Sequence, residues 1–137
     1  MQGDLIPAYL EHAMSKLLFI FIGGGVGASL RYAISLLFLH QHKPLWLGTL
    51  TANTVGCFLI GCIYGILLSK SQFLSDHLKL GLTVGFLGGL TTFSTFSWET
   101  LTFLKEAKLL AGIGYMQASC LVGLLCAWAG YLVSGRF

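Results

Sequence analysis

Charged side chains are the groups that this sequence has least of. They make up 9% of the 137 residues, with only five Asp and Glu, whereas 55% of the residues are hydrophobic. A soluble domain carries roughly a quarter charged residues, so this chain cannot cover itself with a surface that water wets. The shortage excludes a soluble catalytic domain, and the sequence predicts an all-α membrane protein.

Catalytic and metal-binding motifs are also missing. We find no nucleophile–base set and no metal-ligand cluster, so we expect neither an enzyme nor a nucleic-acid partner. The cysteines lack C-x-x-C spacing, and we interpret them as small apolar residues within the spans: Cys57, Cys62, Cys120 and Cys126. The first residues have no basic region ahead of an apolar core, so they are not a secretory signal.

Long apolar segments account for most of the chain. Four of them reach the length of about 20 residues that a transmembrane helix needs, at residues 17–39, 46–68, 80–103 and 109–134. We therefore predict a multi-pass membrane domain over residues 16–137. A short polar extension, residues 1–15, precedes it, and the sequence does not decide whether this extension is helical.

Positive charges are divided evenly between the two sides of the membrane. Four spans put both termini on one side, together with Lys16, Lys70, Lys79 and Arg136. The opposite side holds Lys43, Lys105, Lys108 and, if its side chain reaches there, Arg31. Because Lys and Arg near the span ends set the orientation, we predict dual topology with pairing of opposite copies. A single orientation set by other features is the alternative.

The third apolar segment contains an unusual run, GFLGGLTTFSTFSWE, at residues 85–99. Glycines loosen the helix there, and hydroxyls follow at Thr91, Thr92, Ser94, Thr95 and Ser97. Irregular polar backbone at membrane depth is tolerated only where protein buries it or where it lines a pathway. The run predicts a helix that is broken in mid-membrane and forms the working part of a channel or transporter.

Uncharged donors and aromatic rings near this run indicate an anion pathway. Phe93 and Phe96 share one helix face, and the positive edges of their rings can face a small anion. Asn53 needs a partner within its span, either across a helix interface or in a permeating ion. Arg31 either snorkels to the membrane interface or raises the anion concentration in a vestibule. Neutral donors suit conduction because they bind an ion without trapping it.

Two further features have open interpretations. Glu99 is the sole acid close to the hydroxyl run, and it either pairs with Arg31 or a partner copy's cation or sits at the interface. Small residues recur at four-residue spacing, as at Gly61 and Gly65, which lets helices approach closely in lipid. Because four short spans enclose little space, we expect the pathway to need a symmetric dimer.

Three stretches of the sequence resemble the Fluc (also called CrcB) fluoride channels of bacteria. They are GGGVGASLRY at 23–32, GTLTANTVGCFLIG at 48–61 and, most specifically, the run at 85–99. The resemblance covers essentially the whole chain after residue 16. It implies an antiparallel, dual-topology homodimer with two fluoride pores, surrounded by lipid in the bacterial plasma (inner) membrane.

The resemblance also implies roles for single residues in the pathway. Phe93 and Phe96 would be ring-edge fluoride ligands, with Asn53 as the pore amide and Arg31 as the vestibule cation. The remaining pathway groups would be Thr92 and Ser94 beside the break, Thr95 on the polar surface that hands fluoride along, and the polar track of Tyr115 and Ser119 on the fourth span. One departure is Gly123, which stands where relatives often carry a hydroxyl.

A bound cation is a further implication of the resemblance. A structural sodium ion at the dimer centre would bind the backbone carbonyls of Gly88 and Thr91, contributed by both subunits. The channel would let the membrane potential drive fluoride out of the cytoplasm, where hydrogen fluoride ionises and accumulates. The alternative is a small proton-coupled multidrug exporter. It needs a membrane-embedded carboxylate, and Glu99 would have to serve.

Overall fold

The computed structural model describes residues 5–69 and 74–135, and every regular element within these ranges is helical. The long helices are α1 (Leu5–His40), α2 (Leu45–Ser69) and α6 (Leu109–Ser134). Between α2 and α6 the chain forms α3 (Asp76–Leu80), the π-helix η1 (Gly81–Leu87), α4 (Gly88–Leu90) and α5 (Phe93–Lys105). Residues 1–4 of the predicted extension, and Lys70 and Arg136 of the charge balance, lie outside the described residues.

Four segments are long and apolar enough to cross a membrane: Ala13–His40, Leu45–Ser69, Asp76–Lys105 and Leu109–Ser134. This result confirms the predicted all-helical protein with four potential spans. Helical structure begins before the first predicted span, because α1 already starts at Leu5. Many large apolar side chains are exposed, as expected of helices whose outer faces meet lipid instead of water.

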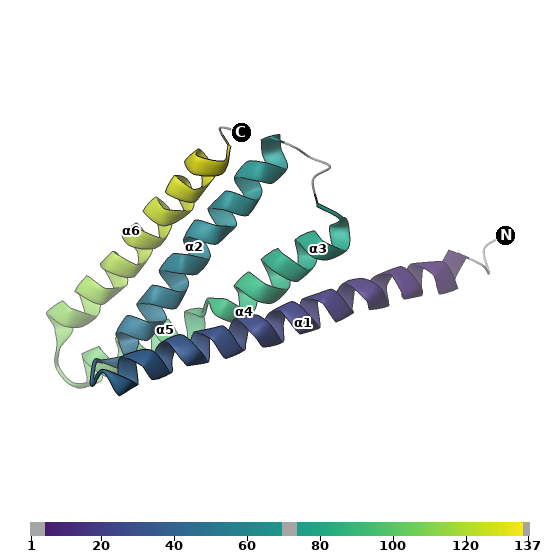
Figure 1. Ribbon diagram of the computed structural model, residues 1–137. Helices are drawn as coiled ribbons and strands as arrows, with labels where there is room; N and C mark the ends of the chain where they lie inside the picture. The colour runs from purple at the N-terminus through teal and green to yellow at the C-terminus, as the bar shows by residue number, and fades with distance from the viewer. Residues whose placement is uncertain (1–4, 70–73, 136–137) are drawn as a thin grey trace.

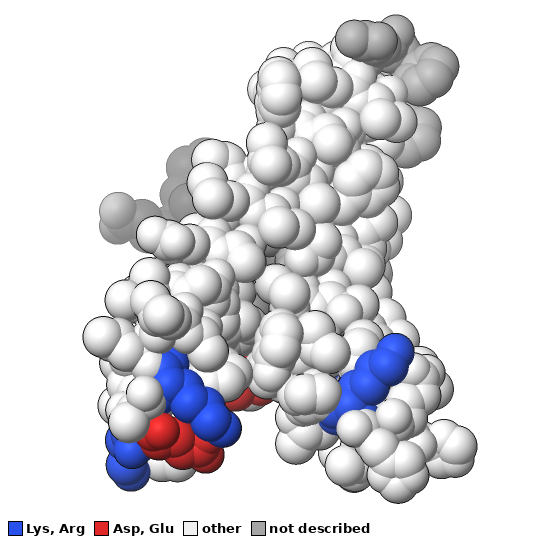
Figure 2. Space-filling model, turned by 90° about the vertical axis from the view of Figure 1, so that its left-hand side faces the viewer, with Lys and Arg blue, Asp and Glu red and all other residues white. Residues whose placement is uncertain are grey.

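The helices form two closely packed groups. In one group α1 lies along α3, η1 and α4, and in the other α2 lies along α6. The groups converge near the α1–α2 and α5–α6 turns and diverge toward the opposite end, where both termini lie (Figure 1). Charged side chains gather at the lower end of the face in Figure 2, and the other described residues on that face are uncharged.

Glycines allow the close contact within each group. A Cβ on Gly61 would collide with the backbone of α6, and a Cβ on Gly130 would collide with the backbone of α2. Gly27 of α1 faces the backbone of η1 and α4 in the same way. Lipid offers no hydrophobic drive for helix association, so close backbone contact supplies much of the attraction.

We predict that Gly130→Ala destabilises the protein by about 2 kcal/mol, because the new methyl group has no room against the backbone of α2. Thermal unfolding of the purified protein in detergent measures the effect. Gly114→Ala is the matched control in the same helix, since a Cβ there meets nothing within 4 Å. Equal unfolding temperatures for the two variants would contradict the role of Gly130 as a contact residue.

Candidate functional site

The third apolar segment leaves the helical conformation at Thr91 and Thr92. Their backbone is extended, with φ and ψ of −87° and 154° at Thr91 and −148° and 123° at Thr92. The Thr91 hydroxyl donates to the carbonyl of Leu87 at 2.8 Å. The Thr92 hydroxyl accepts from the amide of Thr95 at 3.2 Å and so caps the start of α5. Each threonine therefore satisfies part of the backbone on its own side of the interruption.

Asn53 of α2 holds this interruption from the neighbouring helix. Its Nδ2 donates to the carbonyl of Thr92 at 3.1 Å, and its Oδ1 accepts from the amide of Thr92 at 2.7 Å. The carboxamide thus replaces the helical partner that the amide of Thr92 loses at the interruption, and it also bonds to the Thr92 carbonyl. Since an amide nitrogen has two hydrogens, Asn53 retains one donor beyond this pairing.

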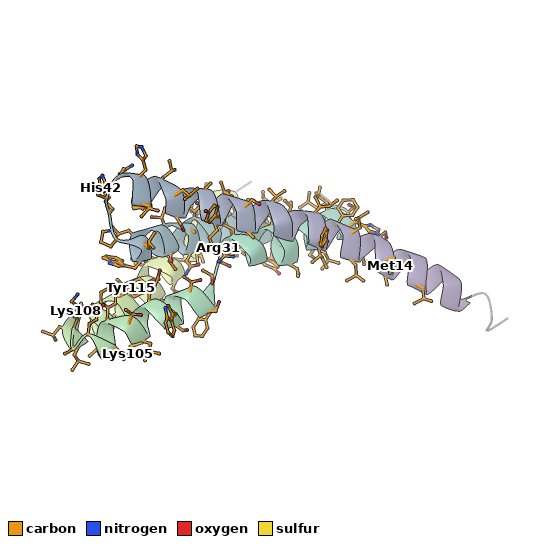
Figure 3. All side chains as sticks on the ribbon, turned by 90° about the horizontal axis from the view of Figure 1, so that it is seen from below. Met14, Arg31, His42, Lys105, Lys108 and Tyr115 are labelled. Atoms are coloured by element: carbon orange, nitrogen blue, oxygen red, sulfur yellow. The ribbon has the colours of Figure 1, made fainter. Side chains whose placement is uncertain are left out.

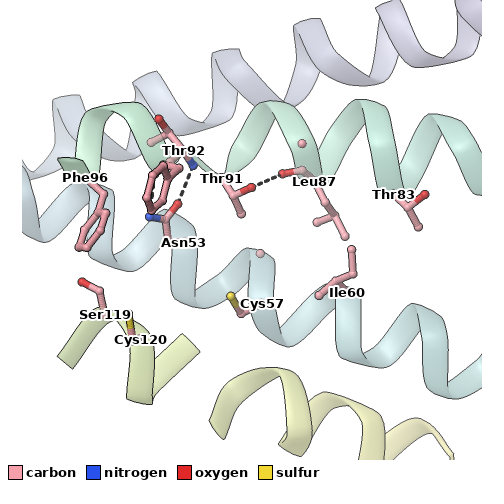
Figure 4. Close-up of a pocket in the computed structure, with 13 residues that line it drawn as sticks. Asn53, Cys57, Ile60, Thr83, Leu87, Thr91, Thr92, Phe96, Ser119 and Cys120 are labelled. Carbon is pink, nitrogen blue, oxygen red and sulfur yellow. Dashed lines mark hydrogen bonds between the residues drawn. The ribbon is translucent and has the colours of Figure 1, made fainter. Parts of the chain in front are cut away.

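A cavity of about 450 Å³ lies beside the interruption. Its walls come from α2, η1, α5 and α6, as Figure 4 shows. The lining contains amide, hydroxyl, thiol and aromatic groups and no Asp, Glu, Lys or Arg among the described residues: Asn53, Cys57, Thr83, Thr91, Thr92, Phe93, Phe96, Ser119 and Cys120, with apolar residues and glycines between them. The cavity is therefore uncharged, and its mainly apolar wall carries a few polar groups.

The two phenylalanines lie together at the start of α5. Their ring centroids are 5.7 Å apart, with the ring planes inclined by 44°. The Phe96 ring also lies 5.3 Å from the ring of Tyr115. Phe93 is 79% exposed, so nothing in this chain covers most of its ring.

Glu99 of α5 joins two groups that the sequence had not connected with it. Its carboxylate accepts from the hydroxyl of Thr49 at 2.8 Å and from the hydroxyl of Tyr115 at 2.7 Å. None of the partners considered for Glu99 from the sequence is the observed one. Thr49 lies one turn before Asn53 on α2, and this shared helix face is a signal that could have placed Thr49 beside α5.

Of the other predicted pathway residues, one lines the cavity and the others do not. Ser119 lines it, and its hydroxyl oxygen is buried. Thr95 and Ser94 do not line it but bond to the Thr92 hydroxyl, at 3.1 Å and 3.3 Å. Tyr115 also lies outside the lining, because its hydroxyl is turned to Glu99.

Arg31 of α1 contacts the interruption from the opposite side. Its Nε donates to the carbonyl of Gly89 at 3.1 Å, near the end of α4. Figure 3 shows the side chain extending from α1 toward that end. Arg31 is not among the residues that line the cavity.

The carbonyls of Gly88 and Thr91 fit the chemistry of a sodium site. Neither accepts a hydrogen bond within the described chain. The amide that would reach Gly88 in a continuous helix, that of Thr92, bonds to Asn53, and the amide that would reach Thr91, that of Thr95, bonds to the Thr92 hydroxyl. A Cβ added to Gly88 meets nothing within 4 Å, so this part of the chain is open on that side. Backbone carbonyls are hard oxygen ligands of the kind that line selective cation sites.

Four helical segments of membrane-spanning length define a multi-pass membrane protein, with an uncharged cavity beside the interruption in the third segment. A family model described as "CrcB-like protein, Camphor Resistance (CrcB)" matches residues 18–131. The chain belongs to this family, as its resemblance to the Fluc (CrcB) channels predicted.

Curated relatives cover nearly the same region. A protein of Pseudomonas putida named "Fluoride-specific ion channel FluC" is 43% identical over 109 residues, which cover 79% of this chain and 87% of the relative. The "Fluoride-specific ion channel FluC 1" of Staphylococcus epidermidis is 38% identical, covering 88% and 97%. A relative of the same type from Azotobacter vinelandii is 40% identical, covering 84% and 93%.

We predict that Asn53→Ala destabilises the protein by about 1–3 kcal/mol, because the substitution leaves the amide of Thr92 unpaired and removes a donor from its carbonyl. Thermal unfolding in detergent measures this loss. Thr54→Ala, at the next residue of the same helix, is the control. If Asn53→Ala unfolded at the same temperature as the control, the pairing with Thr92 would not support the fold.

Proposed function

We propose that this protein is a fluoride-selective ion channel that lets cytoplasmic fluoride leave passively, down its electrochemical gradient. The observation that carries the proposal is the uncharged cavity beside the Thr91–Thr92 interruption, whose mainly apolar wall presents an amide and several hydroxyls. The relatives named as fluoride-specific ion channels give the ion its identity. Such a protein conducts without chemical change of its substrate, and it is not an enzyme.

The start of α5 supports an anion in this cavity. In α5 the amide of Thr95 donates to the capping hydroxyl of Thr92. The two amides before it, those of Phe93 and Ser94, have no hydrogen-bond partner in the described chain. Free amides and the positive end of the helix dipole attract anions. A fluoride ion that sheds its water here exchanges it for neutral donors, which hold the ion weakly enough to release it.

Single residues take complementary parts in this pathway. The edges of the Phe93 and Phe96 rings face the ion, and the free Asn53 amide hydrogen donates to it. Further donors follow along the interruption and the fourth span: Thr92, Ser94, Thr95, Ser119 and Tyr115. The buried hydroxyl of Ser119 supports this part of the proposal most directly, because it lines the same cavity.

The assembly we propose is an antiparallel homodimer in the bacterial plasma membrane. Phe93 is 79% exposed in the single chain, and the open side of Gly88 leaves its carbonyl accessible to a second copy. A structural sodium ion between the copies would bind the Gly88 and Thr91 carbonyls of each. It would neutralise the carbonyl dipoles that the interrupted helices leave at the interface.

A proton-coupled exporter lacks support at the residue it requires. Glu99 would have to carry the proton and the cation, but both of its oxygens already accept hydrogen bonds, from Thr49 and Tyr115. A carboxylate held in this way is poorly placed to bind an organic cation.

The ring-edge role predicts the effect of Phe93→Ile and Phe96→Ile on transport. Isoleucine keeps the apolar bulk but removes the positive ring edge, and losing ~1.4 kcal/mol of anion stabilisation lowers fluoride efflux about tenfold. A fluoride electrode records efflux from vesicles that contain each purified variant. Leu101→Ile, at an exposed position farther along α5, is the control. Efflux at the wild-type rate from both phenylalanine variants would exclude the ring-edge role.

Dual topology predicts that a single cysteine appended after the last residue is labelled from both sides of the membrane. Intact cells receive an impermeant maleimide, and a second reagent then labels the remaining sites after lysis. We expect roughly half of the sites in each fraction, because the charge balance gives no orientation preference. Labelling from one side only would show a fixed orientation.

A further inference from the structure

The end of α4 is contacted by one cationic side chain, that of Arg31 on α1. The sequence explains this contact. Gly24, Gly27 and Ala28 let α1 approach so closely that a Cβ on Gly27 would meet the backbone at Phe86, and a Cβ on Gly89 would meet the backbone at Gly24. Arg31 lies one turn beyond Gly27 on the same face of α1. The close backbone approach therefore delivers its guanidinium to the carbonyl of Gly89.

This carbonyl is one of those that the interruption deprives of a helical partner. In a continuous helix Gly89 would accept from the amide of residue 93, but α4 ends at Leu90 and α5 begins at Phe93. The last carbonyls of a helix need partners from outside it. Arg31 supplies one through its Nε at 3.1 Å, and the bond leaves the other guanidinium nitrogens available.

The charge of Arg31 also changes the potential at this helix end. The continuous helical stretch from Asp76 to Leu90 directs its negative dipole end at the interruption. The cavity that we assign to fluoride begins there, with Thr91 and Thr92 in its wall. An uncompensated negative helix end raises the free energy of an anion as it passes the interruption, and with it the barrier to conduction, and a guanidinium at the same end lowers that barrier.

Arg31 has no competing partner and does not reach the cavity. The one ion pair within residues 5–69 and 74–135 joins Lys108 and Glu106, at the α5–α6 turn. The nearest acid to the hydroxyl run, Glu99, is bound by Thr49 and Tyr115. Arg31 is absent from the cavity lining, so its influence on an ion passes through the helix end.

We propose that Arg31 is a positioning residue that caps the first half of the interrupted span at Gly89 and offsets its negative end, without binding the ion itself. This inference rests on the proposed fluoride channel. It differs from a vestibule role for Arg31, in which the side chain only raises the concentration of fluoride near the entrance. The two roles predict different dependence on fluoride concentration.

The test compares fluoride efflux from vesicles that contain the wild type, Arg31→Gln or Arg31→Lys, over a range of fluoride concentrations. A lost cap lowers the maximal rate about tenfold in Arg31→Gln and leaves the half-saturating concentration near the wild-type value. The loss persists at about 1 M salt, where exposed charges are screened within about 3 Å. Arg31→Lys recovers only part of the rate, because an ammonium cannot reproduce the Nε contact.

Lys43→Gln is the control, since it removes one positive charge at the α1–α2 turn without contacting the interruption. Its maximal rate should equal that of the wild type. A maximal efflux rate in Arg31→Gln equal to that of the wild type would overturn the proposal. If Arg31→Gln does not reconstitute into vesicles, the maximal efflux rate of Arg31→Lys is compared with that of the wild type in its place. If the wild-type protein itself releases no fluoride, the proposed channel function is wrong. The contact of Arg31 with Gly89 is then tested separately, by comparing the unfolding temperatures of Arg31→Gln and Lys43→Gln. If the unfolding temperature of Arg31→Gln were no lower than that of Lys43→Gln, the proposal that Arg31 caps the helix end would be wrong as well.

Discussion

Backbone hydrogen bonding inside a hydrocarbon layer is the constraint on which this structure depends. An unpaired amide or carbonyl there costs several kcal/mol, yet the third span leaves the helical conformation at Thr91 and Thr92. Asn53 pairs both backbone groups of Thr92, and the Thr92 hydroxyl caps the amide of Thr95. Neutral groups therefore pair the backbone of Thr92 and Thr95, and Arg31 contacts the end of α4. The described residues that line the adjoining cavity carry no charged side chain, which suits the proposed passage of an anion.

Close helix contact allows this arrangement to form. Glycines such as Gly27 and Gly130 bring backbones together within each of the two helix groups, so that side chains from α1 and α2 reach the interruption from opposite sides. The groups diverge toward the termini (Figure 1), and the exposed ring of Phe93 lies on a surface that this chain does not cover. A second copy in the opposite orientation is the proposed way to complete the site.

The number and approximate positions of the spans could be predicted from the sequence, because apolar length alone determines them. The hydroxyl run likewise predicted irregular structure near Thr91, and Asn53 was expected to need a partner. The identity of that partner could not be predicted, since the contact with Thr92 joins residues far apart in the sequence. The link of Glu99 to Thr49 and Tyr115 was missed for the same reason. The π-helical geometry of η1 had no signal, because a seven-residue segment is too short for the wider turn of a π-helix to change the hydrophobic pattern.

In the proposed channel, uncharged groups beside the interruption replace the water shell of fluoride more readily than that of a larger halide. In the most direct measurement, vesicles that contain the wild-type protein are loaded with potassium fluoride or potassium chloride. A potassium ionophore is then added, so that K⁺ leaves with the anion and no opposing membrane potential builds up. The account predicts rapid release of fluoride, with chloride retained as in protein-free vesicles. Retention of fluoride, or equally fast release of both halides, would contradict it.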